Sequence, residues 1–419
     1  MRRYLAVLAT TAITFLCWTT PGYADIHQPA VVSEDPVDWT PNVLDGQVNA
    51  IAVVGSTVVV GGNFARIAEA GSRQSYYQPY IFAFDSSTGR LVDFRPNLDG
   101  PVNSLVAGPD NTVYAGGGFR VVNDERRRGV VRLNLSNGEI TDGFEGTVGN
   151  GEVKSMELHR NALYVAGTFT YVGGRRQNVL ARLDSRTGWP DPSFDVEVAA
   201  PNHPRVKIED TALSPDGQRL VIIGEITQVN GQPRSQLALL NVGGGRPTVD
   251  PWYTLAYDAW CHRSFDTYVR AVDFSPTGSY FVVVTTGAVS GPQRMCDTAA
   301  RFDPRGSGAH DPTWVNHTGG DTLTAVSVTG TAVYVGGHQR WMSNPYGRNF
   351  AGRGAIPRIG IAALDPRDGS VLAWNPTRLR GKGVGVMVAT DYGLYVGSDT
   401  NVLGREYHGK LGMFPLHRR

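Results

Sequence analysis

VNAIAVVGSTVVVGGNF, at residues 48–64, is the stretch that determines the fold. It contains two apolar runs separated by a short turn, and it ends in Gly-Gly-x-Phe. Similar copies read VNSLVAGPDNTVYAGGGF at residues 102–119 and VKSMELHRNALYVAGTF at residues 153–169. Weaker copies begin at Val206, Val269, Leu323 and Val384. A pattern that returns about every 50 residues predicts a repeat architecture, in which each unit buries its faces against its neighbours.

Each copy continues with a third apolar run that ends in Asp-x-x-Thr-Gly or a close variant. In IFAFDSSTG, at residues 81–89, the aspartate can accept backbone N–H groups and the glycine supplies a positive φ. A short fourth run follows, and an aromatic residue closes it: Phe94, Phe144, Phe194, Trp252, Trp314 or Trp374. Four consecutive strands per copy are typical of a propeller blade. We therefore predict an all-β protein, a seven-bladed β-propeller of four-stranded antiparallel blades.

The two ends of the chain complement each other. The last copy reaches Leu416 without a fourth run, whereas VDWTPN at residues 37–42 matches the fourth run VDFRPN at residues 92–97 and has no inner strands of its own. We predict that residues 36–41 close the last blade as an N-terminal strand, which leaves no sheet edge open. A β-solenoid or a string of sandwiches would explain the repeat but not this match.

The first residues have the pattern of an export signal. Arg2 and Arg3 precede an apolar stretch at residues 5–18, and Gly22-Tyr-Ala24 supplies small residues for cleavage. We expect a signal peptide at 1–24, an N-terminal extension at 25–35, a single β-propeller domain at 36–419, and a secreted, extracellular product. A lipoprotein attached at Cys17 and twin-arginine export are the alternatives, and the export route stays open.

Cysteine usage agrees with an oxidising compartment. Without Cys17, only Cys261 and Cys296 remain, in connections that leave the same face of the predicted disc. We predict a disulfide between them, with free thiols or a redox pair as alternatives.

Charge and motif content exclude several functions. A formal net charge of +1 disfavours nucleic acid and anionic membranes as partners. No Cys/His spacing suggests zinc, and no Asp-rich loop has the ligand spacing of a calcium site. The glycine pairs lack the Gly-Lys-Ser/Thr of a phosphate loop. We therefore expect no metal and no cofactor, and the chain contains no long apolar segment after its start that could span a membrane.

The Gly-Gly-x-Phe strand end, the Asp-x-x-Thr-Gly turn and the Phe- or Trp-closed outer strand resemble the delta-sixty-repeat propellers of secreted bacterial proteins. The kelch and quinoprotein propellers are more distantly similar. The resemblance covers residues 36–416 and weakens at Ile226 and Gly287, so it leaves the boundaries of blades four and five open. It implies a fold and a secreted address but no reaction, and no catalytic residue is assigned.

Tight turns occupy one predicted face, and long connections occupy the other, including the longest at 338–358. Loops over a rigid scaffold often carry binding. Aromatic rings stack on sugars or peptides, and guanidinium groups hold carboxylates. The candidate ligand-binding residues are Trp260, Arg263, Arg340, Trp341, Tyr346, Arg348 and Phe350. We predict a monomeric secreted propeller that binds or scaffolds a cell-envelope glycan or protein. The alternative is that the aromatics only cover the blade ends and the arginines are merely solvated.

A secreted carbohydrate-active enzyme, either a polysaccharide lyase or a glycosidase, is the second functional hypothesis. Its acids and bases would come from His203, His262 and His338 with Asp258, Asp266 or Asp297. No catalytic signature accompanies them, so binding is preferred. Carboxylates with shifted pKa converging at the central channel would favour the enzyme, and an exposed aromatic shelf on the rim would favour binding.

Overall fold

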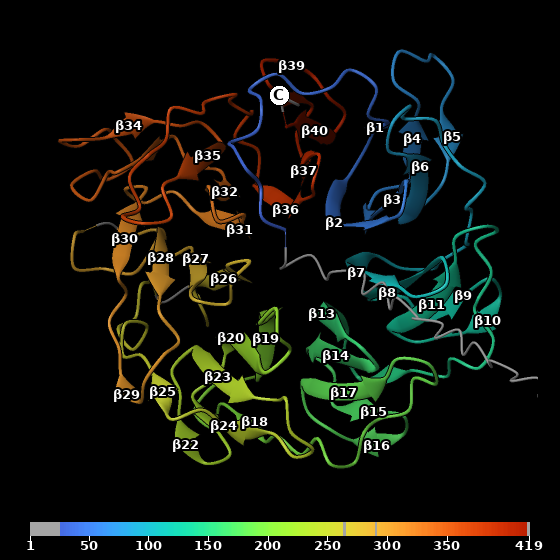
Figure 1. Cartoon of the computed structure of the whole chain (residues 1–419), viewed down its shortest axis with the longest axis horizontal. Coiled ribbons are helices and arrows are strands. Elements are labelled where there is room, and N and C mark those ends of the chain that lie inside the picture. The colour runs from blue at the N-terminus through green and yellow to red at the C-terminus, as the bar shows by residue number, and fades with distance from the viewer. Residues whose placement is uncertain (1–25, 263–264, 290, 417–419) are drawn as a thin grey trace, which may run out of the picture.

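The computed structural model describes residues 26–262, 265–289 and 291–416 (Figure 1). Within these ranges the ordered elements are all β-strands. The predicted signal peptide at 1–24 lies outside the described residues.

Seven sheets, numbered here 1 to 7 in chain order, contain the long strands of the described chain. Their first strands are β2 (Gln47–Val54), β7 (Val102–Gly108), β13 (Val153–His159), β19 (Lys207–Leu213), β26 (Val269–Phe274), β31 (Leu323–Val328) and β36 (Val384–Ala389). The second strands are β3 (Thr57–Asn63), β8 (Thr112–Gly117), β14 (Ala162–Gly167), β20 (Arg219–Glu225), β27 (Phe281–Thr285), β32 (Val333–Gly337) and β37 (Gly393–Ser398). The third strands are β6 (Ile81–Asp85), β11 (Val130–Asn134), β17 (Leu180–Asp184), β23 (Leu237–Asn241), β28 (Thr298–Phe302), β35 (Ile361–Leu364) and β40 (Leu411–Pro415). Figure 1 shows the sheets arranged radially, with the first strands nearest the centre.

The hydrophobic core lies between successive sheets. The cluster between sheets 1 and 2, for example, joins Ala83 and Phe94 to Val113 and Phe119. The predicted closing aromatics are all buried: Phe94, Phe144, Phe194, Trp252, Trp314 and Trp374. Each sheet therefore buries its faces against its neighbours, as the repeat predicted.

The fourth strand is weaker than predicted. It forms a ladder only in sheet 4, as β24 (Thr248–Val249), and in sheet 5, as β30 (Trp314–His317). In sheet 1 the fourth run makes a single bridge, between Leu91 and Phe84. The chain then bends, since the N–H of Phe94 donates to the carbonyl of Val92 at 2.8 Å, and this bend inserts the aromatic ring into the core. Burial of the ring thus replaces a longer ladder.

The N-terminal residues run beside β40 (Figure 1). The N–H of Val37 donates to the carbonyl of Met413 at 2.9 Å, and Val92 makes the corresponding bond to Ala83 at 3.1 Å in sheet 1. The motif match between residues 37–42 and 92–97 therefore corresponds to equivalent hydrogen bonds. Trp39 differs from the closing aromatics because it is 39% exposed and donates its indole N–H to Ser86.

A left-handed backbone residue precedes or begins the third-strand segment of every sheet. These residues are Tyr80, Gly129, Val179, Gln236, Asp297, Gly360 and Lys410, with φ between 55° and 76°. In six sheets the N–H of this residue donates to the carbonyl at the Phe position of Gly-Gly-x-Phe or its equivalent, which is Phe64, Phe119, Phe169, Ile226, Gln339 or Thr400. In sheet 5 the N–H of Asp297 donates instead to the carbonyl of Thr286, one residue before the equivalent Gly287. The repeat is thus preserved in the backbone where it has disappeared from the sequence.

The face carrying the connections between second and third strands is called the hairpin face. Most of the predicted loops here are ordered hairpins. They are β4 (Arg66–Ala68) with β5 (Tyr76–Tyr77), β9 (Val121–Val122) with β10 (Glu125–Arg126), β15 (Tyr171–Val172) with β16 (Arg175–Arg176), β21 (Gln228–Val229) with β22 (Gln232–Pro233), β33 (Trp341–Met342) with β34 (Ile356–Pro357), and β38 (Val402–Leu403) with β39 (Glu406–Tyr407). Three of them pair with a short strand that precedes the first strand of their own sheet: β1 (Asn42–Val43), β12 (Val148–Gly149) and β18 (Val198–Ala199). In the connection after sheet 4, β25 (Trp252–Tyr253) pairs with β29 (Gly308–Ala309).

Candidate functional site

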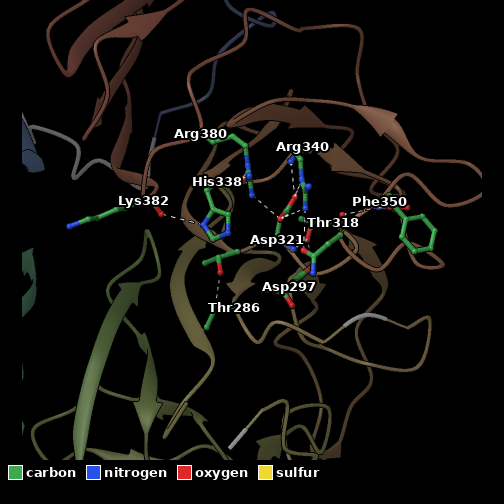
Figure 2. A network of polar contacts seen from close by, with 12 residues as sticks. Thr286, Asp297, Thr318, Asp321, His338, Arg340, Phe350, Arg380 and Lys382 are labelled. Carbon is green, nitrogen blue, oxygen red and sulfur yellow. Dashed lines mark hydrogen bonds and ion pairs between the residues drawn. The ribbon is translucent and has the colours of Figure 1, made fainter. Parts of the chain in front are cut away.

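Two buried aspartates from neighbouring sheets form the centre of a polar network on the hairpin face (Figure 2). Asp297 lies directly before β28 of sheet 5, and Asp321 lies before β31 of sheet 6. The carboxylate of Asp321 accepts hydrogen bonds from Arg340 Nε at 2.9 Å, Arg340 Nη2 at 3.0 Å and Arg380 Nη2 at 3.0 Å. A buried carboxylate needs such partners, because removing charge from water is costly unless opposite charge and hydrogen bonds compensate it.

Arg340 therefore supports the fold of the network, although the sequence suggested a ligand-binding role. Besides its two hydrogen bonds to the carboxylate of Asp321, Arg340 donates to Asn349 Oδ1 at 3.1 Å. Its guanidinium also lies 4.5 Å from the ring centroid of Trp341. Trp341 itself is half-buried. With its donors used in this way, Arg340 holds the long 338–358 connection against sheet 6.

Asp297 is completely buried, and only one of its two carboxyl oxygens has a hydrogen-bond partner among the described residues. Its Oδ2 accepts the N–H of Val289 at 3.1 Å, and its Oδ1 has no hydrogen-bond partner among the described residues. Burial raises the pKa of Asp297 to about 7, and the negative charge of Asp321 acts in the same direction. The carboxyl is therefore divided between its protonated and ionised forms near neutral pH.

A groove of about 330 Å³ opens beside this network. Its lining consists of Ala288, Val289, Gly319, Gly320, Arg348 and Asn349. Two exposed aromatics, Tyr346 at 62% and Phe350 at 56%, come from the same connection as Arg348. Of the predicted ligand-binding residues, Arg348 lines the groove, and Tyr346 and Phe350 are exposed in the same connection.

The disulfide connects the segment after Trp260, another predicted ligand-binding residue, to this region. Cys261 and Cys296 are bonded, with their Cα atoms 5.7 Å apart, so the segment after Trp260 is tied to the residue before Asp297. Trp260 is 54% exposed, and its ring stacks on that of His203 at 5.5 Å. Arg263 lies outside the described residues.

Gly287 has a structural reason to be glycine. Its φ is 151°, and a Cβ at this position would lie 2.6 Å from Cys296 Cβ and 2.8 Å from Cys261 Cβ. The sequence suggested that Gly-Gly-x-Phe had simply decayed here. In the structure, a larger residue would not fit here beside the disulfide, so the position requires glycine.

The proposed acids and bases of the hairpin face are divided between separate contacts, and the charge of Asp266 acts on Glu225, the partner of His203. His203 Nδ1 lies 3.2 Å from Glu225 Oε1, and His338 Nδ1 lies 3.3 Å from the carbonyl of Lys382. Asp297 belongs to the separate network described above. In the described part of the chain, no group of three or more His, Cys, Asp or Glu residues is arranged to hold a metal ion.

Three carboxyls of the first strands were missed by sequence reasoning. Asp210 accepts the N–H of Val272 in the next sheet at 3.0 Å, and Asp273 accepts the N–H of Val328 at 2.7 Å. Glu157 bonds in the same way to the backbone of Leu213. Each side chain keeps part of its surface accessible, but protein atoms surround it closely. An acidic residue in an otherwise apolar inner strand is the signal that could have revealed them.

Burial raises the pKa of all three carboxyls: Asp210 to about 6, Asp273 to about 8 and Glu157 well above its ordinary value. The charge of Asp210 contributes to the shifts of the other two. The carboxyls therefore link the open edges of successive first strands and do so in partly protonated form.

Comparison with known proteins supports the fold. Residues 108–140 and 161–194 match a family described as a domain of unknown function (DUF5122) beta-propeller. The crystal structure of the WD40 beta propeller domain of Doa1 is similar with a TM-score of 0.51 at 9% identity, covering 92% of this chain and 97% of that one. The computationally designed Ika8 protein gives a TM-score of 0.47 at 13% identity, covering 92% of this chain and 100% of its own. No curated protein matches.

These findings define the class of protein as an all-β propeller, a fold often used for binding or scaffolding. The family match covers two of the repeats, and the structural likeness concerns the fold alone. Among the described residues, no helix has the length and apolar character needed to cross a membrane.

Proposed function

We propose that this chain is a secreted, monomeric binding or scaffold module of the delta-sixty-repeat type, directed at a glycan or protein of the cell envelope. In this proposal each of the seven sheets is one blade, and the N-terminal segment closes the last blade through the Val37–Met413 hydrogen bond. Residues 1–24 would be removed on export. The Cys261–Cys296 disulfide is compatible with an extracellular location.

One observation carries the binding function: the groove lined by Arg348, in a connection that also exposes Tyr346 and Phe350. Exposed rings offer flat surfaces for sugar rings or for a protein side chain, and a guanidinium can pair with a carboxylate. The Asp321–Arg340 network beneath fixes the backbone of this connection, which lowers the entropy lost on binding.

The proposal is tested by measuring binding of the purified mature protein to a glycan array and to envelope fractions. Tyr346→Ala with Phe350→Ala should weaken binding at least tenfold. Trp189→Ala is the matched control, because Trp189 is 66% exposed but belongs to a third-to-fourth strand turn on the opposite face. Absence of binding to every glycan and every envelope fraction would refute the proposal.

A second function, a carbohydrate-active enzyme with its site on the same face, has one supporting observation in the raised pKa values of the channel carboxyls. Binding is preferred because Asp210 and Asp273 already accept backbone N–H groups of the next sheet. An assay for chain cleavage of any bound glycan separates the two. New reducing or unsaturated chain ends that disappear in Asp273→Asn would replace the binding proposal by the enzyme.

A further inference from the structure

Lysine is rare in this chain and is concentrated in one place. Of the 39 lysines and arginines, only Lys154, Lys207, Lys382 and Lys410 are lysine. The first two belong to the first strands β13 and β19, and Lys382 lies just before β36. Three of the four therefore gather where the first strands begin, at the hairpin-face mouth of the central channel.

The mouth is shaped by a β-bulge near the start of each first strand. The ladder register shifts between Val48 and Ala50 in sheet 1, and between Val384 and Val386 in sheet 7. Equivalent shifts occur in the other five sheets. A bulge aims one extra side chain away from the ladder. In sheets 1, 2, 3, 6 and 7 the bulged residues line a single pocket of about 380 Å³: Asn49, Asn103, Lys154, Thr324 and Gly385.

The polar groups of this pocket divide into two sets. Lys154 is 3.0 Å from Glu152, and Asn103 Nδ2 donates to Glu152 and to the carbonyl of Val153. By contrast, the side chains of Gln47, Asn49 and Lys382 have no hydrogen bond or ion pair within the described residues. Uncommitted donors and acceptors therefore collect where sheet 7 meets sheet 1.

Lys382 is held so that its ammonium group faces this pocket. Its backbone N–H donates to Asp399 Oδ2 at 2.6 Å, and its carbonyl contacts His338 Nδ1 at 3.3 Å. Figure 2 shows the side chain directed away from the Asp321 network. The next bulged residue, Gly385, permits close approach of the two sheets, since a Cβ there would lie 1.9 Å from the carbonyl of Val48.

We propose that this channel mouth binds a small sugar acid, independently of the rim groove. The ammonium of Lys382, with that of Lys154 nearby, pairs with the carboxylate. The amides of Gln47 and Asn49 both donate and accept, as sugar hydroxyls do, whereas inorganic phosphate is mainly an acceptor and has fewer O–H donors to offer the amide oxygens. A volume of about 380 Å³ suits a ligand of one or two sugar rings.

Titration calorimetry of the mature protein with glucuronate, glucose and inorganic phosphate tests this site. Glucuronate should bind, and glucose should bind at least about tenfold more weakly because it lacks the charge. Lys382→Gln and Asn49→Ala should each weaken glucuronate binding by about tenfold or more. Arg186→Gln, at an exposed position on the opposite face, should leave it unchanged.

The melting temperature without ligand separates loss of binding from loss of fold, and Lys382→Gln should retain the wild-type value. No heat with glucuronate, unchanged binding in both Lys382→Gln and Asn49→Ala, or equal affinity for phosphate would each overturn the assignment. Because Tyr346→Ala with Phe350→Ala tests the groove beside Arg348 separately, failure here leaves that result intact.

Discussion

The junction between sheets 1 and 2 and the junction between sheets 5 and 6 share one backbone plan but differ in chemistry. At the hairpin end of the first junction Phe119 is buried in an apolar cluster. At the second, the segments that follow the second strands hold Thr286 and Gln339, among buried Asp297 and Asp321. The regular repeats thus supply the apolar scaffold. Where the sequence departs from the repeat, the same backbone carries a polar network, a disulfide and the longest connection.

The largest expected effect tests the apolar side of this comparison. Phe119→Ala should reduce the free energy of unfolding by about 3–5 kcal/mol, because a fully buried ring leaves a cavity between two sheets. Thr286→Ala, at a buried position directly after the second strand of sheet 5, should cost about 1 kcal/mol, since it loses chiefly the hydrogen bond to Thr322. Urea unfolding measures both, and equal losses would contradict the difference between the two junctions.

Removing the disulfide should have the next largest effect. Cys261→Ser with Cys296→Ser opens a link of sequence separation 35, so the free energy of unfolding should fall by roughly 3–4 kcal/mol. The measurement is the urea midpoint of the double variant, compared with that of the wild type with and without reductant. If neither the double substitution nor the reductant moved the urea midpoint, the stability of this region would not depend on the disulfide.

Asp321→Asn should destabilise the protein by about 2–3 kcal/mol, because two arginines lose a buried carboxylate. Asp99→Asn is the matched variant in the regular region. Asp99 accepts the backbone N–H groups of Arg120 and Val121 and has no ion pair within the described residues, so we expect about 1 kcal/mol. Thermal or urea unfolding would contradict the account if Asp99→Asn were the more damaging change.

The channel carboxyls predict a loss of stability as the pH rises. The folded-state pKa of Asp273 is about 8, above its ordinary value of 3.8. The stabilisation that protonated Asp273 gives the folded state is therefore complete below pH 3.8 and is lost as the pH rises through about 8. Between pH 6.5 and 8.5 the free energy of unfolding should fall by about 2 kcal/mol. Asp273→Asn should flatten this slope, and the exposed control Asp124→Asn should leave it unchanged.

His317 has the opposite effect on the pH dependence of stability, but its effect falls mainly below this pH range. Burial lowers the pKa of His317 to about 4, so that its contribution is lost only as the pH falls below its ordinary 6.5. A wild-type unfolding free energy that rises from pH 6.5 to 8.5 would show that the carboxyl shifts have been assigned the wrong sign.

The smallest expected effect concerns Gln339, whose buried side-chain nitrogen and oxygen have no hydrogen-bond partner among the described residues. Gln339→Leu should stabilise the protein by about 1 kcal/mol, because an unpaired amide is replaced by an apolar group. Phe119→Leu at the equivalent position should instead destabilise by a similar amount. Destabilisation by Gln339→Leu would indicate that the amide is satisfied in solution.

The sequence predicted the strand pattern because apolar alternation and turn residues act locally. The starts of the weak copies at Val269 and Leu323 coincide with β26 and β31, and the disulfide joins the two predicted cysteines. Four-stranded ladders were overpredicted, because the closing aromatics are buried by a bend and not by a longer strand. The long loops are largely hairpins, which the sequence did not indicate.

The candidate site was predicted only in part. Arg348 lines a groove and Tyr346 and Phe350 of the same connection are exposed, while their role in binding stays a prediction. The use of Arg340 by Asp321 could not be predicted, since it depends on a contact between residues from separate segments. The channel mouth depends on the bulge in each first strand, and a bulge leaves no clear mark in a single sequence.

Hydrogen exchange of the N-terminal segment tests the proposed closure of the last blade by residues 36–41, on which the assignment of connections to the two faces depends. The N–H groups of Ser33 and Val37 donate to Pro415 and Met413 at 2.8 and 2.9 Å. The account predicts that the amide of Val37 exchanges as slowly as that of Val92 in the mature protein. Exchange at the rate of an unstructured peptide would contradict closure by the chain ends.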